Sequence, residues 1–135
     1  MRKLQPNEAH EFGFDARELW IASDCILERG GRYRLEVVAQ TEPWVDGWLA
    51  CTPDGGWPWW ARPGDWYARS KARAPNLPMY VVVGSIERDL ATYFQALEPP
   101  SWTAPRDGQL ELFANDWPER YWNNKGRLSL RLSRS

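Results

Sequence analysis

Residues 107–132, which read DGQLELFANDWPERYWNNKGRLSLRL, decide the fold of this chain. In the first part of this stretch Leu110, Leu112 and Ala114 occupy every second position, and polar residues or Phe113 lie between them. In the last part, leucine alternates with arginine or serine. A period of two is typical of a strand with one apolar and one polar face. We therefore predict strands at Leu110–Ala114 and Leu128–Leu132, joined by a polar loop.

Two earlier segments also have strand patterns. Apolar residues alternate with Arg and Glu in Tyr33–Val38, directly after a glycine turn. Met79–Val83 is a continuous and mostly β-branched apolar run, which predicts a buried strand. Several short strands separated by turn residues indicate an all-β protein, an antiparallel β-sandwich. For residues 86–97 the pattern leaves a short helix and a strand with a loop as alternatives.

The length of 135 residues predicts one domain. Residues 1–11 are polar, and we expect a loose N-terminus followed by a single β-sandwich domain over residues 12–135. Six of the ten Trp residues lie between Trp44 and Trp66. Proline and glycine are frequent in the same region, which predicts an irregular Trp-rich insertion at about residues 53–75. We expect it to cover one end of the sandwich and to bury most of its Trp rings. The alternative is that Trp57, Trp59, Trp60, Trp66 or Tyr67 is exposed and stacks on sugar rings.

Composition excludes several classes of function. A net charge of −1 gives no electrostatic reason to expect binding to nucleic acid or membranes. No secretory signal or membrane-spanning run is visible, so a cytoplasmic protein is the default, with non-classical release left open. The only His is His10, and no catalytic motif is present, so we do not expect an enzyme. Cys25 and Cys51 leave the question of a disulfide open.

The polar loop holds three oxygen donors close to the ends of the two predicted strands. Asp116 follows the first strand, and Asn123 and Asn124 precede the second. Calcium prefers such hard oxygen ligands when rigid elements fix their positions. The alternative is an ordinary loop, because Asn and Asp side chains commonly bond to their own backbone.

Four segments of the chain, ASDCILERGGRYRLEV, CTPDGG, PMYVVVGSI and the ND…NN-x-G pattern of the loop, resemble successive parts of one family. The family comprises bacterial β-sandwich carbohydrate-binding domains similar to the soluble calcium-dependent galactophilic lectins. The likeness extends from about Phe12 to Leu132 and implies a jelly-roll-like, galactose-binding-domain-like sandwich. It also implies a calcium ion that bridges protein and sugar hydroxyls. The implied metal ligands are the side chains of Asp116, Asn123 and Asn124 and the carbonyl of Arg120, with a further carbonyl near Trp44 or Val45.

The resemblance also implies a ligand surface. We expect sugar contacts from Asp116 and Asn123 and from the aromatic residues Trp44, Trp117 and Trp122. A galactoside is the ligand class that the family suggests, but residues 45–75 contain neither the His nor the Gln with which similar lectins contact sugar. The sugar identity is therefore not carried over, and a homo-oligomer is left open.

Positive charge next to the loop argues against a metal, because Arg120 and Lys125 would repel a cation if they pointed inward. The principal alternative is a metal-free β-sandwich that acts as a protein-interaction or structural module through its aromatic insertion. A hydrolase is a third and weaker reading, since paired carboxylates can cleave glycosides but no spacing here indicates them.

Overall fold

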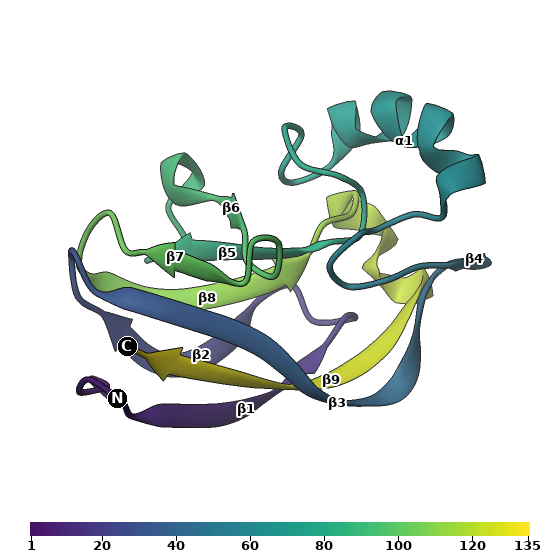
Figure 1. Cartoon of the computed structure of the whole chain (residues 1–135). Coiled ribbons are helices and arrows are strands. Elements are labelled where there is room, and N and C mark those ends of the chain that lie inside the picture. The colour runs from purple at the N-terminus through teal and green to yellow at the C-terminus, as the bar shows by residue number, and fades with distance from the viewer.

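Two antiparallel β-sheets face each other in the computed structural model, which describes residues 1–135 (Figure 1). The predicted all-β class and antiparallel sandwich are confirmed. The elements in chain order are β1 (Ala9–Asp15), β2 (Ile21–Leu27), β3 (Arg32–Asp46), β4 (Leu49–Ala50), η1 (Trp59–Ala61), α1 (Arg62–Ala68), η2 (Arg69–Lys71), β5 (Val82–Ile86), η3 (Leu90–Thr92), β6 (Phe94–Gln95), β7 (Ser101–Thr103), β8 (Gly108–Ala114), η4 (Pro118–Asn123) and β9 (Asn124–Arg134). None of the helices has the length and apolar character that crossing a membrane requires.

The first sheet has the strand order β1-β9-β3-β4, with β7 also paired to β3. The second sheet has the order β2-β8-β5-β6. The two strands of the deciding stretch, β8 and β9, therefore lie in different sheets, and η4 carries the chain from one sheet to the other. This crossing is what places the polar loop at one end of the sandwich.

The predicted strands are observed with different bounds. β3, β8 and β9 extend beyond the predicted ranges, because the ladders continue through polar residues and glycines that break the alternation of the sequence. β5 begins at Val82 rather than at Met79. The reason is Tyr80, which has a positive φ of 67° and bonds through its N–H to the Asn115 carbonyl. Residues 86–97 contain both alternatives, a short 3₁₀ turn (η3) and a short strand (β6).

Residues 1–11 do not form the loose terminus that their polarity suggested. Leu4 is buried in the main core, and Arg2 exchanges backbone hydrogen bonds with the strand at Asp24 and Ile26. β1 already begins at Ala9 and pairs with β9. A single apolar residue and backbone pairing thus order this segment, and a composition argument cannot detect either.

The main core lies between the sheets and comprises 21 buried residues. It includes alternate side chains of β2, β8 and β9, which is the consequence of their period-two sequences. Trp44 of β3 is part of this core, where its ring lies against Phe14 and Tyr80. A smaller cluster formed by Ala68, Ala72 and Met79 lies beneath the insertion.

The Trp-rich insertion is more ordered, and more exposed, than expected. It forms the short helical segments η1, α1 and η2 above the end of the sandwich that also carries β4 and η4 (Figure 1). The prediction that most of its Trp rings are buried is wrong, since Trp59, Trp60 and Trp66 are exposed. Ala68 and Ala72 provide the inner surface of the insertion, and such short helical segments cannot direct every large ring inward.

Candidate functional site

Three strand ends meet below the insertion and form the candidate site. Asp116 comes shortly after the end of β8, Asn124 begins β9, and Asp46 ends β3. Asp46 is the register partner of Asn124, and the N–H of Gly47 donates to the Asn123 carbonyl over 3.1 Å. The sheet pairing itself therefore brings Asp46 to the predicted oxygen donors.

Three buried side-chain oxygens at this point have no hydrogen-bond partner: Asp116 Oδ2, Asn123 Oδ1 and Asn124 Oδ1. They are the only such side-chain atoms in the chain, and they belong to the three side chains that the sequence predicted as calcium ligands. An unsatisfied buried acceptor costs about 1–3 kcal/mol, and a missing ion is one of its ordinary explanations. The three atoms therefore indicate a site that requires a cation or a donor.

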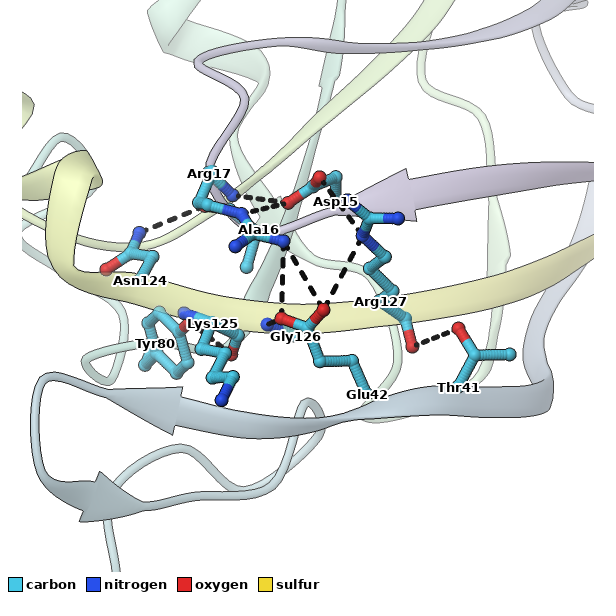
Figure 2. A network of polar contacts seen from close by, with 10 residues as sticks. All are labelled: Asp15, Ala16, Arg17, Thr41, Glu42, Tyr80, Asn124, Lys125, Gly126 and Arg127. Atoms are coloured by element: carbon cyan, nitrogen blue, oxygen red, sulfur yellow. Dashed lines mark hydrogen bonds and ion pairs between the residues drawn. The ribbon is translucent and has the colours of Figure 1, made fainter.

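The amide of Asn124 is held in one orientation. Its Nδ2 donates to the Ala16 carbonyl over 3.0 Å, so its Oδ1 points away from that contact (Figure 2). The neighbouring backbone is also fixed, because the N–H of Lys125 donates to the Tyr80 hydroxyl and that of Gly126 to Glu42. The Asn124 oxygen is thus positioned by the start of β9 and not by a flexible loop.

Asn115, the residue before Asp116, shows what a satisfied amide looks like in this part of the chain. Its Oδ1 accepts the N–H of Ala74, and its Nδ2 donates to the carbonyls of Ala74, Leu77 and Pro78 at 2.9–3.1 Å. Asn115 therefore links the end of β8 to residues 74–78 at the end of the insertion. The contrast shows that unsatisfied oxygens are a property of the site and not of every buried amide nearby.

Two carboxylates lie close together at the site. Burial is the largest cause that raises the pKa of Asp116 to about 7, and the charge of Asp46 raises it further. Burial also raises the pKa of Asp46, although the indole N–H of Trp57 donates to its Oδ2 over 2.7 Å and opposes this shift. Two carboxyl groups that resist ionisation together are the expected electrostatic environment for a divalent cation.

The two cationic residues that argued against a metal do not pair with the carboxylates. Arg120 is exposed, and its guanidinium lies over the Trp117 ring at 5.4 Å and not in a salt bridge with either carboxylate. It still lines the pocket, and its positive charge opposes the rise in the pKa of both Asp116 and Asp46. Lys125 is exposed and adjacent to buried Asn124 in β9, so the two side chains point to opposite faces of the strand. The position of Lys125 therefore leaves the donor side of the strand free of its charge.

The donor set fits calcium better than zinc. Two carboxylates and two amide oxygens are hard ligands, and no group of three or more His, Cys, Asp or Glu side chains is placed to hold a metal. A pocket of about 190 Å³ adjoins these donors and is lined by Asp46, Asp116, Asn123 and Arg120 together with Trp57, Ala68, Met79 and Trp117. The residues present therefore fit a calcium ion that remains accessible from one side.

The aromatic residues predicted to contact a ligand lie in three different environments. Trp44 is only 2 % exposed and donates its indole N–H to the Tyr80 carbonyl, so we remove it from the predicted ligand surface. Its carbonyl accepts the N–H of Cys51 over 2.8 Å. Trp117 lines the small pocket, with its indole N–H bonded to the Ala68 carbonyl. Trp122 is exposed but does not line this pocket.

Sequence reasoning missed Asp46 and Trp57. The signal for Asp46 was its place in the dipeptide Asp46-Gly47, which ends one strand and begins a two-residue turn to β4. For Trp57 the sequence offered a place in the insertion's core or a sugar-stacking role, and only the fold shows its bond to Asp46.

Comparison with known proteins supports the fold. One solved structure, described as the EclA N-terminal domain, a PllA-like lectin, matches with a TM-score of 0.62 over 93 % of this chain and 95 % of that one. The two sequences are 18 % identical, so the likeness concerns the fold. No family model and no curated protein matches the sequence.

Proposed function

We propose that this protein is a non-catalytic carbohydrate-binding module that holds its sugar through a calcium ion. The observation that carries the proposal is the set of unsatisfied oxygens on Asp116, Asn123 and Asn124. Asp46 supplies a second carboxylate beside them. The solved protein of similar fold is described as a lectin, which supports the sugar part of the proposal.

Coordination chemistry connects the ion to a sugar. Calcium takes six to eight oxygen ligands. Three side chains, with Asp46 and the proposed carbonyl of Arg120, leave positions that two adjacent hydroxyl groups of a sugar can fill. The ion would supply a fixed positive charge for those hydroxyls, and Asp46 and Asn123 would accept or donate hydrogen bonds around them. A galactoside is the ligand class that we propose first, on the sequence resemblance alone.

Thermal unfolding tests the metal part. A ligand that binds only the folded state stabilises it by about 2.7 kcal/mol at a hundredfold excess over its Kd. We expect millimolar calcium to raise the Tm of the wild type relative to chelator, and to leave the Tm of Asp116→Asn unchanged. The matched control is Asp54→Asn, the same chemical change at an exposed aspartate outside the donor pocket, which should keep the calcium shift.

Sugar binding in calcium and in chelator tests the second part. Calorimetric titration with methyl galactosides should give heat of binding in calcium only. If the Tm is the same in calcium and in chelator, the metal part fails. If the Tm shifts but no sugar from a glycan array binds, the protein is a calcium-binding module without lectin activity.

One observation favours a second candidate, a metal-free interaction module. Five large aromatic side chains outside the small pocket are exposed at the same end of the molecule: Trp48, Trp59, Trp60, Trp66 and Tyr67. Exposed aromatic patches commonly mark interaction surfaces. Unchanged stability in calcium, combined with loss of a partner on substitution of these residues, would favour this candidate.

A further inference from the structure

A second hollow adjoins the small pocket on the side of β4. Its volume is about 500 Å³, and four residues line both hollows: Asp46, Trp57, Arg120 and Asn123. The remaining lining residues come from the β3–β4 turn and from the insertion: Gly47, Trp48, Leu49, Trp60, Ala61 and Gly64. The two hollows therefore adjoin along shared residues, and we call the second hollow the groove, with the residues of the oxygen-donor pocket at one end of it.

Two exposed Trp rings form the outer part of this groove. Trp48 is 79 % exposed and Trp60 is 52 % exposed. Their ring centroids lie 5.7 Å apart at an angle of 32°, so the two rings pack against each other at a tilt and each keeps part of its surface exposed. The positive φ of Gly47, 62°, makes the tight turn that places Trp48 at the tip between β3 and β4. Both rings thus have defined positions although neither is buried.

The groove combines an aromatic surface with polar groups. Asp46, Asn123 and Arg120 provide hydrogen-bond acceptors and donors, and the two indoles provide flat apolar area. A pyranose ring has the matching character, with C–H groups on its faces and hydroxyl groups around its rim. A groove of a few hundred Å³ is in the usual range for small ligands and too small for a protein domain.

We propose that this groove is a second sugar subsite, so that the protein recognises an oligosaccharide and not a single sugar. One residue of the glycan binds at the calcium ion, and the next residue stacks on Trp48 and Trp60. This inference rests on the proposed function, because the first sugar fixes where the second one lies. The combination of exposed aromatic rings with polar groups that also line the oxygen-donor pocket favours a glycan over a lipid surface or a peptide.

Paired sugars test the subsite. Methyl galactosides and the corresponding galactose-terminated disaccharides are titrated into the calcium-loaded full chain. Aromatic stacking contributes about 0.5–1.5 kcal/mol, which corresponds to about a twofold to tenfold gain in affinity. We expect at least one disaccharide linkage to bind the wild type more tightly by this factor. Trp60→Ala and Trp48→Ala should lose the gain and keep the affinity for the monosaccharide.

Trp66→Ala is the matched control, because Trp66 is an equally exposed residue of the insertion that does not line the groove. It should bind both sugars as the wild type does. If every disaccharide binds no better than the monosaccharide while calcium-dependent binding persists, the subsite is refuted and the proposed function stands. If Trp66→Ala is as impaired as Trp60→Ala, or if the Trp variants lose the calcium shift in Tm, the subsite is likewise refuted. Absence of any sugar binding overturns both proposals.

Discussion

The proposed calcium site depends most on Asp116. The sequence identified it through its spacing from Asn123 and Asn124, and the structure adds that its Oδ2 is buried without a partner. The Asp46-Gly47 dipeptide indicated a turn, but the sequence could not show that Asp46 lies beside the donors, because this proximity results from the pairing of β3 with β9. The sequence also misassigned Trp44, because the predicted strand ended at Val38 and nothing indicated that β3 continues and directs this ring into the core.

The pH dependence of stability follows from Asp116. Its pKa is about 7 in the folded protein against 3.8 ordinarily, so the folded state binds the proton more tightly. The stabilisation that protonated Asp116 provides is fully present below pH 4, and it is lost as the pH rises through 7. Three pKa units correspond to an upper value of about 4 kcal/mol. The chelated wild type should therefore melt at lower temperature at pH 8 than at pH 5.

Asp116→Asn is the comparison for this measurement. Without the ionisable group, its Tm should depend less steeply on pH, although Asp46, whose pKa is raised as well, leaves part of the slope. Calcium should also make the Tm of the wild type depend less on pH, because the ion binds the ionised form of Asp116. A chelated wild type whose Tm rises between pH 5 and pH 8 would contradict the assignment.

At the scale of elements, the sequence predicted the strands more accurately than the insertion and the N-terminal segment. Period-two patterns located β8 and β9, although only β9 is buried at alternate positions and β8 is buried on both faces. The insertion was misjudged because proline and glycine content does not reveal that Ala68, Ala72 and Met79 suffice as its inner surface. Large rings are then left outside, and one of them, Trp60, lines the groove together with Trp48 of the β3–β4 turn.

The start of β9 is sensitive to added volume at Gly126. A Cβ built there would collide with the ring of Trp44 in the core. Overpacking of this kind costs about 1–3 kcal/mol, so Gly126→Ala should lower the free energy of unfolding by that amount in urea titration. Gly13→Ala in β1 is the control, because nothing lies within 4 Å of its Cβ position. Equal stability of the two variants would show that the contact between β9 and Trp44 is looser than described.

The Trp residues of the insertion should differ sharply in their contribution to stability. Trp57→Ala loses packing against two core clusters and the bond to Asp46, and we expect a loss of about 2–3 kcal/mol. Trp59→Ala removes an exposed ring and should stay within about 0.5 kcal/mol of the wild type. Chemical denaturation measures both. A large loss for Trp59→Ala would mean that its ring is packed after all.

At the scale of the whole molecule, the two-sheet arrangement gathers the functional residues at one end. β8 and β9 belong to different sheets, so the loop between them must cross the end of the sandwich. The turn between β3 and β4 and the insertion reach the same end (Figure 1). The oxygen donors and the aromatic residues of the groove therefore come from segments that are distant in the sequence. Patterns within single segments predicted the oxygen donors but not the aromatic residues of the groove.

The central claim is that one calcium ion binds between the ends of β3, β8 and β9. Crystals grown with calcium, measured at a wavelength that gives calcium an anomalous signal, test it most directly. The account predicts one anomalous peak at about 2.3–2.6 Å from the side-chain oxygens of Asp116, Asn123 and Asn124. A calcium-grown crystal with no peak there, or with the Arg120 guanidinium bound to Asp116 in its place, would contradict it.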